Sequence, residues 1–104
     1  MGFFSNLFGT APKVDFKELV ARGAIIIDVR TPQEFSTGNI KGSVNIPVSA
    51  LPHRVGSLSK QKPIIVYCAS GSRSASAKGF LDQQGFAEVY NGGSYRALYR
   101  HLNE

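Results

Sequence analysis

The hydrophobic pattern of the chain consists of short apolar runs separated by segments that carry helix signals. Two continuous runs rich in isoleucine and valine, residues 24–30 and 63–67, predict strands that are covered on both faces. Shorter runs at residues 43–46 and 87–90 predict two further strands. Strands separated by helical crossovers favour an α/β fold, in which a central parallel sheet carries helices on both faces.

Helix signals fill the gaps between these runs. Capping-box spacing predicts helices that begin after Asp15 and after Thr31. Pro52 and Gly56 weaken the first of the later helices, and Gly92 with Gly93 predicts a turn before the last one. These later helices are expected at residues 49–58, 72–84 and 94–101.

Length and charge narrow the class of protein. A chain of 104 residues suits one domain with one core. The 12 basic residues outnumber the 7 acidic ones, but they are spread along the chain, which favours a solvated basic surface over nucleic-acid binding. One cysteine cannot form an internal disulfide, so we expect a cytoplasmic protein. No stretch is long enough to span a bilayer, and no membrane-spanning segment is expected.

The first twelve residues differ in character from the rest. Residues 1–12 are expected to form a short apolar segment that packs on a domain of residues 13–104. Phe3, Phe4, Leu7 and Phe8 fall at helical spacing on one side, and contact with a partner or a membrane surface remains the alternative. The segment lacks the basic start and continuous apolar core of a signal peptide.

Cys68 follows the second apolar run directly, at the point where a strand should give way to a helix. Four small residues and then an arginine follow it: Ala69, Ser70, Gly71, Ser72 and Arg73. Backbone N–H groups of such a loop, together with the positive end of the helix, would stabilise a thiolate and lower its pKa. Free cysteines are more often inert and buried, and the flanking loop favours the reactive interpretation here.

The residues around the cysteine suggest how it would work. Gly71 can adopt positive φ, so that consecutive N–H groups converge on an anion. Arg73 can donate to an incoming oxyanion, or it can pair with Asp28 or Glu34 and brace the loop. The two histidines lie far from Cys68 in the sequence, so neither a zinc site nor a cysteine–histidine pair is expected.

Four motifs in this order resemble the single-domain rhodanese family of sulfurtransferases. The resemblance covers residues 14–98 and is specific because the motifs keep both order and spacing. The motifs are Asp28-Val29-Arg30 with Glu34, residues 38–47, the Cys68 loop in residues 66–74, and Asn91-Gly92-Gly93. Asn39 and Ala97 depart from the family, which often has histidine and tryptophan at these positions.

The resemblance implies a rhodanese-like three-layer sandwich with a sheet of four to five parallel strands. A fifth strand would have to be very short and lie near Lys13 and Val14. It also implies that Cys68 takes sulfur from thiosulfate or a similar small anionic donor and becomes a persulfide. Cyanide, an external thiol or a protein acceptor then removes the sulfur, without a cofactor or metal. Asp28, Arg30 and Glu34 are expected to support the loop from behind.

Two other functions stay open at the level of the sequence. One is a sulfur-carrier or binding module that serves a protein partner with little turnover of its own. The other is an enzyme like a dual-specificity phosphatase or arsenate reductase, whose loop between cysteine and arginine is one residue longer. The four-residue loop found here favours a single sulfur atom over a tetrahedral oxyanion.

Overall fold

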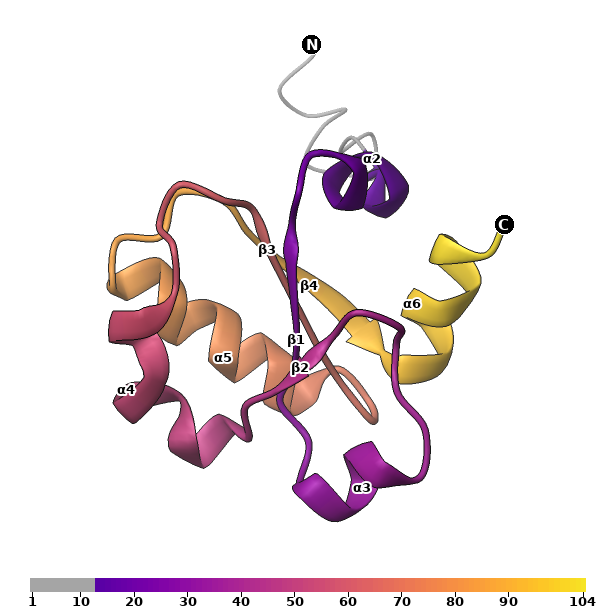
Figure 1. The fold of residues 1–104 in the computed structure, drawn as a ribbon, viewed down its shortest axis with the longest axis horizontal. Helices are drawn as coiled ribbons and strands as arrows, with labels where there is room; N and C mark the ends of the chain where they lie inside the picture. Colours follow the sequence, from indigo (N-terminus) through magenta and orange to yellow (C-terminus); the bar gives the residue numbers. More distant parts are fainter. Residues whose placement is uncertain (1–12) are drawn as a thin grey trace, which may run out of the picture.

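The structure is a computed structural model that describes residues 13–104. Its centre is one sheet of four parallel strands in the order β2-β1-β3-β4, as the apolar runs predict (Figure 1). The strands are β1 (Ile25–Asp28), β2 (Val44–Asn45), β3 (Ile64–Cys68) and β4 (Val89–Ser94). All five residues of β3 are buried, because this central strand is covered on both faces.

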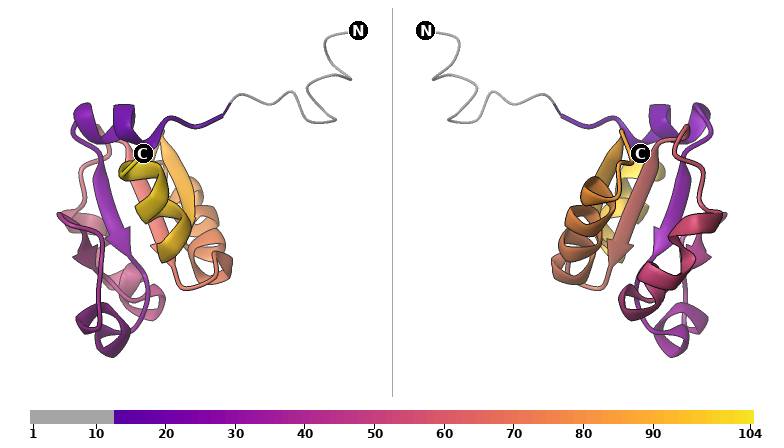
Figure 2. Two further views of the ribbon diagram at one scale, coloured as in Figure 1. Left: turned by 90° about the vertical axis from the view of Figure 1, so that its right-hand side faces the viewer. Right: turned by 90° about the vertical axis from the view of Figure 1, so that its left-hand side faces the viewer.

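Helices cover both faces of the sheet, so the predicted three-layer sandwich is confirmed (Figure 2). The α-helices are α2 (Phe16–Ala21), α3 (Pro32–Ser36), α4 (Leu51–Arg54), α5 (Ser72–Gln83) and α6 (Tyr95–Leu102). Helices α4 and α5 pack on one face of the sheet, and α2 and α6 pack on the other. Helices α2 and α3 begin at the predicted caps, where Asp15 and Thr31 accept hydrogen bonds from backbone N–H groups.

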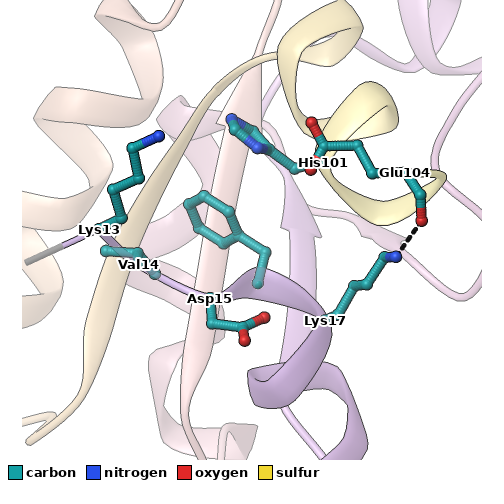
Figure 3. A pocket seen from close by; sticks show the side chains of 7 residues that line it. Lys13, Val14, Asp15, Lys17, His101 and Glu104 are labelled. Atoms are coloured by element: carbon teal, nitrogen blue, oxygen red, sulfur yellow. Dashed lines mark hydrogen bonds between the residues drawn. The ribbon is translucent and has the colours of Figure 1, made fainter.

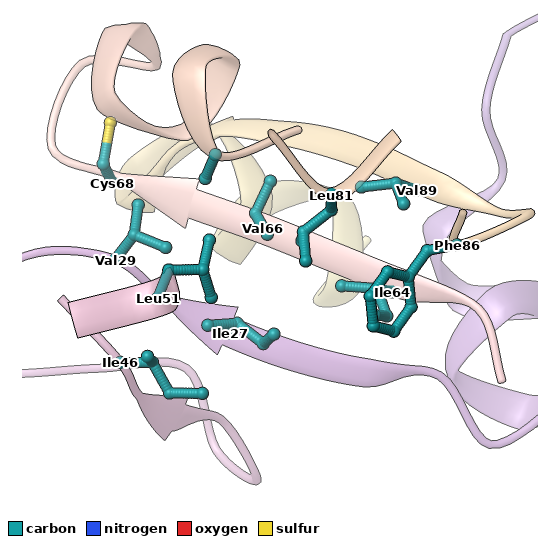
Figure 4. Close-up of a cluster of buried hydrophobic side chains, with 11 residues drawn as sticks. Ile27, Val29, Ile46, Leu51, Ile64, Val66, Cys68, Leu81, Phe86 and Val89 are labelled. Carbon is teal, nitrogen blue, oxygen red and sulfur yellow. The ribbon is translucent and has the colours of Figure 1, made fainter. Parts of the chain in front are cut away.

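Two hydrophobic clusters hold the layers together, one on each face of the sheet. The cluster under α5 includes Ile64, Val66 and Cys68 of β3 together with Leu51 and Leu81 (Figure 4). The cluster under α2 and α6 is formed by Ile65 and Tyr67 of β3 with Phe16, Leu19, Ile26, Ile40 and Leu98. Because side chains alternate along a strand, Cys68 lies on the α5 face, whereas Tyr67 lies on the other.

The helix predicted at residues 49–58 is broken into three short pieces. Helix α4 spans only four residues, between the 3-10 turns η2 (Val48–Ala50) and η3 (Val55–Ser57). Pro52 lies in the first turn of α4, where its missing N–H costs nothing, and it prevents a longer helix from running through it. Gly56 lies in η3 and adds no side chain that could support a longer helix.

The turn predicted at Gly92 and Gly93 is wrong, because β4 continues to Ser94. The register against β3 shifts here: Val66 pairs with Asn91, whereas Tyr67 pairs with Gly93. Gly92 is the extra residue of this irregularity, and a Cβ atom on it would lie 3.1 Å from side-chain atoms of Ile65 and Leu98. The two glycines therefore allow a bulge within β4 and close packing of side chains against it, and they do not reverse the chain.

Two further expectations concern the N-terminal side. Lys13 and Val14 form no strand, and the sheet of residues 13–104 has four strands, the lower of the two predicted numbers. The expected packing of residues 1–12 lies outside the described residues. Across residues 13–104, the helices are too short or too polar for any of them to cross a membrane.

Candidate functional site

The Cys68 loop lies at the carboxyl ends of the two central strands, at the point where the chain connections run to opposite edges of the sheet. From β1 the chain moves outward to β2, and from β3 it moves outward to β4 on the opposite side. Strands β1 and β3 are adjacent and parallel, and they end at Asp28 and Cys68 on the same edge. Ligands of open α/β sheets bind beyond the carboxyl ends of the strands at such a point.

The backbone of the loop turns toward the cysteine sulfur. The N–H of Gly71 donates to Cys68 Sγ over 3.0 Å, and the N–H of Ser74 donates over 3.4 Å. This geometry depends on Gly71, which caps α5 with a φ of 100°. A Cβ atom on Gly71 would also contact the Gly93 backbone at 3.5 Å, so β4 lies directly behind the loop. The loop thus concentrates N–H groups on one atom, as the small residues predict.

These contacts shift the acidity of the thiol. Burial of Cys68 raises the pKa of its thiol, because the charged form loses its hydration. Hydrogen bonds from Ser74, Gly71 and Ser70 oppose this effect, and together they bring the pKa below its ordinary value. Cys68 is therefore a fully buried cysteine whose thiol has a lowered pKa, which distinguishes it from an inert core cysteine.

Arg73 follows the loop and binds a carboxylate on the neighbouring helix α3. Its Nη1 and Nη2 atoms donate to Glu34 Oε1 and Oε2 over 2.7 and 3.0 Å. Glu34 is itself held by Thr31, whose N–H donates to Oε1 in the capping box of α3. The Arg73 guanidinium and then Thr31 lower the pKa of Glu34 to about 2. Of the two partners considered for Arg73, the structure selects Glu34, and the pair ties the loop to α3.

Asp28 and Arg30 lie on the opposite face of the sheet from Cys68. Arg30 donates through Nε and Nη2 to both Asp28 oxygens and through Nη2 to the Gly38 carbonyl, which is 2.7 Å away. Its guanidinium lies over the ring of Tyr95, 4.9 Å from the centroid. This buried group of residues holds the chain after α3 against the sheet, and its contacts with the Cys68 loop are indirect.

Asn91 is the site residue that sequence reasoning did not single out. Its side chain accepts a hydrogen bond from Ser74 Oγ over 2.7 Å and donates to the Gly71 carbonyl over 3.2 Å. In the sequence it was visible only as the first residue of the Asn91-Gly92-Gly93 motif. Asn91 lies on β4 next to the end of β3, so its place in the site could be predicted only once the strand order is known.

The other three small residues of the loop and both histidines are exposed at the protein surface. Ala69, Ser70 and Ser72 are exposed at the surface of the loop, and the hydroxyls of the two serines lie 3.2 Å apart. His53 is exposed on α4, and His101 packs on Phe16 under α6, on the face opposite Cys68. Within residues 13–104, no three His, Cys, Asp or Glu side chains are arranged to hold a metal ion.

Two surface hollows lie away from this loop. One of about 740 Å³ is formed where the start of α2 meets the end of α6, and its lining includes Phe16, Lys17 and His101 (Figure 3). Another of about 500 Å³ lies between α2 and α6 and includes Ile40 and Tyr99. The linings of both hollows exclude the Cys68 loop, so neither extends the candidate site.

Comparison with known proteins places the chain among sulfur-handling domains. The family described as "Rhodanese-like domain" matches residues 13–98. A thiosulfate sulfurtransferase GlpE of Stutzerimonas stutzeri is 39% identical over 79 residues, which are 76% of this chain and 72% of that relative.

Solved structures give the same result for the fold. The human single-domain sulfurtransferase TSTD1 aligns with a TM-score of 0.70 at 28% identity, covering 86% of this chain and 96% of that one. A rhodanese with anions from E. coli aligns with a TM-score of 0.68 at 30% identity, covering 71% of this chain and 89% of that one. The family match includes the β3–α5 region that carries Cys68.

Proposed function

The chain belongs to the rhodanese-like domain family, and from this premise we propose that it transfers sulfane sulfur through a persulfide on Cys68. The single observation that carries the proposal is the convergence of the Gly71 and Ser74 N–H groups on the cysteine sulfur. This arrangement both favours the attacking thiolate and provides a place for a sulfur-bound negative charge. The relative from S. stutzeri is named for thiosulfate, which makes thiosulfate the first donor to test.

The first half-reaction forms the persulfide. The Cys68 thiolate attacks the outer sulfur of thiosulfate, and a new S–S bond forms to Sγ. The original S–S bond of the donor breaks, and sulfite leaves with the bonding electron pair. Cys68 then carries a terminal sulfur with one negative charge, so charge is conserved across the step.

The second half-reaction returns the enzyme to its starting state. Cyanide, or the thiolate of an acceptor, attacks the terminal sulfur, and Sγ leaves as a thiolate. The acceptor becomes thiocyanate or a persulfide. Since Cys68 is the only cysteine in the sequence, the accepting group belongs to another molecule, either a small nucleophile or a partner protein. The two steps are separate, which predicts ping-pong kinetics.

The state of Arg73 supports sulfur transfer over phosphatase or arsenate reductase activity. Its Nη1 and Nη2 atoms both donate to Glu34 of α3, so the guanidinium is already paired with a carboxylate. The phosphatases considered above direct such a guanidinium to the oxyanion that they transfer, in a loop that is one residue longer. Only four residues separate Cys68 from Arg73, and the converging N–H groups face one sulfur atom.

A carrier role for a protein partner is the second candidate. A NAD-dependent persulfide reductase from A. fulgidus contains a similar domain, which aligns over 75% of this chain and 14% of that one with a TM-score of 0.62. Rhodanese-like domains thus also occur as parts of larger sulfur-handling proteins.

We propose that the protein acts in a reducing compartment such as the cytoplasm, where the Cys68 thiolate is protected from oxidation.

The test is a steady-state assay with thiosulfate and cyanide that measures sulfite and thiocyanate. We expect equal amounts of both products and a family of parallel lines in double-reciprocal plots. Cys68→Ser is the matched control and should release neither product. A phosphate monoester is assayed alongside, and its hydrolysis by the wild type but not by Cys68→Ser would favour the phosphatase alternative. Absence of thiocyanate with folded wild-type protein would contradict turnover and leave only the carrier role.

A further inference from the structure

Asn91 and Ser74 form a hydrogen-bonded pair of polar side chains next to the cysteine. Ser74 is fully buried in the first turn of α5, and its Oγ lies 3.4 Å from Cys68 Sγ. The same Oγ lies 2.7 Å from Asn91 Oδ1 on β4. One hydroxyl therefore lies between the reactive sulfur and an amide oxygen.

The orientation of the Asn91 amide is fixed by its other neighbours. The N–H of Gly93 donates to Oδ1 over 2.9 Å, and Nδ2 donates to the Gly71 carbonyl over 3.2 Å. A flipped amide would set its NH₂ against the Gly93 N–H and its oxygen against the Gly71 carbonyl. Oδ1 therefore faces Ser74, and because an amide oxygen only accepts, the Ser74 hydroxyl must donate to it.

A serine hydroxyl has a single proton, so the bond to Asn91 determines what Ser74 offers to the sulfur. While that proton points to Asn91, Ser74 Oγ can only accept, and the partner it suits is the S–H of a Cys68 thiol. A thiolate needs a donor instead. The hydroxyl must then rotate from Asn91 to the sulfur, and Oδ1 still keeps the hydrogen bond from Gly93.

We propose that Asn91 is a positioning residue, which holds the Ser74 proton while the sulfur is uncharged and releases it when Sγ becomes a thiolate. The cycle proposed above requires this change twice, before attack on the donor and when Sγ leaves the persulfide. In the persulfide the charge is on the outer sulfur, and the hydroxyl returns to Asn91. The link to the cycle rests on the proposed function, whereas the hydrogen-bond exchange concerns this chain alone.

Removing the competing acceptor has a definite consequence. In Asn91→Ala the hydroxyl has only the sulfur as partner, so the thiolate is favoured and the midpoint of alkylation against pH falls. A neutral hydrogen bond is worth about 1 kcal/mol, which corresponds to a shift of about 0.7 pH units. Asn91→Asp does the opposite, because a carboxylate holds the Ser74 proton more strongly and repels the thiolate.

The pair of variants separates this role from loop support. A residue that only held the loop through the Gly71 carbonyl would raise the midpoint in both variants. The charged groups near the sulfur are Arg73 of α5 and its partner Glu34 of α3, and Asp28 of β1 lies on the other face of the sheet. All of them stay intact in every variant, and because the new carboxylate of Asn91→Asp raises the midpoint by its charge alone, the direction in Asn91→Ala is the decisive one.

The experiment measures iodoacetamide alkylation of Cys68 from pH 5 to 10 in the full chain. We expect a lower midpoint in Asn91→Ala, a higher one in Asn91→Asp and in Ser74→Ala, and a wild-type midpoint in Ser74→Thr, which restores the hydroxyl. In the Ser74→Ala background, Asn91→Ala should lower the midpoint no further. Ser76→Ala on the exposed side of α5 and Asn103→Ala at the end of α6 are the matched controls.

Midpoints that move in the same direction in Asn91→Ala and Asn91→Asp would overturn the proposal. So would a lowering by Asn91→Ala that persists without the Ser74 hydroxyl. Asn91→Leu, which keeps the shape of the side chain, replaces the alanine variant if that protein does not fold. The readout needs no sulfur donor, so a chain that fails to take sulfur from thiosulfate can still show the expected shifts, and the two failures remain distinct.

Discussion

At the scale of the residue, the reactivity of Cys68 is a balance between burial and hydrogen bonding. Burial disfavours the thiolate, and the N–H groups of Gly71 and Ser74 with the Ser74 hydroxyl favour it more. A buried cysteine without such donors would have a raised pKa. The lowered pKa of Cys68 therefore comes from the Ser74 hydroxyl and the backbone N–H groups of the loop together.

The first prediction is that the Cys68 thiol titrates below the ordinary value of about 8.5. Below that pKa the thiol is protonated, so the alkylation rate of the wild type should fall only when pH drops under the depressed value. Iodoacetamide labelling against pH measures the midpoint. Unfolded protein in urea is the control and should titrate near the ordinary value. A folded midpoint at or above that of the unfolded chain would show that burial outweighs the donors.

The second prediction concerns the Arg73–Glu34 pair. Glu34 has a pKa of about 2 in the folded protein, below its ordinary value of 4.5, so the pair stabilises the fold fully above pH 4.5. This contribution is lost as pH falls through about 2. Urea unfolding should therefore show Glu34→Gln to be less stable than wild type at pH 7, with the difference disappearing toward pH 2. A difference that is independent of pH would exclude an ionic origin.

At the scale of the element, the sequence predicted what is local and missed what depends on neighbouring strands. The caps at Asp15 and Thr31, the buried run of β3 and the positive φ of Gly71 all follow from residue types and short spacings. The bulge in β4 and the role of Asn91 do not, because they require the pairing of β4 with β3. The helix predicted at residues 49–58 is broken, because Pro52 allows only a short helix to begin there.

The third prediction uses two glycines with opposite surroundings. Gly92→Ala places a Cβ atom 3.1 Å from Ile65 and Leu98 and should destabilise the protein by about 1–3 kcal/mol. Gly79→Ala, in α5, meets nothing within 4 Å and should stabilise it by about 0.5–1 kcal/mol. Urea unfolding of both variants measures the difference. Equal stabilities would mean that the bulge in β4 tolerates a side chain.

The fourth prediction tests the length of the loop. Insertion of one glycine between Gly71 and Arg73 displaces the N–H groups from Cys68 Sγ while leaving β3 and most of α5 intact. Loss of one preorganised donor costs about a hundredfold in comparable anion holes, and sulfur transfer should fall by about that factor. A matched insertion at the exposed Gly56 should leave the rate unchanged. Full activity in the longer loop would refute the argument from loop size.

At the scale of the whole molecule, the site and the surface hollows occupy different parts of the fold. The contacts of the Cys68 loop come from α3, β3, α5 and β4, whereas the hollows lie around α2 and α6. We propose that residues 1–12 form a short apolar segment that packs on the domain. The family and the layered fold could be predicted from the motifs, whereas the N-terminal segment belongs to none of them and its packing stays a prediction.

The fifth prediction follows from this separation. A chain shortened to residues 13–104 keeps every contact described for the Cys68 loop. Its sulfur-transfer rate and alkylation midpoint should equal those of the full chain, while its stability should fall if the segment packs on the domain. Parallel activity and urea measurements on both chains test this. A folded, shortened chain without activity would place part of the site in residues 1–12.

Intact-protein mass spectrometry after incubation with thiosulfate shows whether Cys68 carries sulfur. We expect the wild-type mass to rise by one sulfur atom, and cyanide should return it to the starting value. Cys68→Ser should show no change under the same conditions. An unchanged mass of folded wild-type protein with a free Cys68 thiol, at every thiosulfate concentration, would mean that Cys68 does not form a persulfide from this donor.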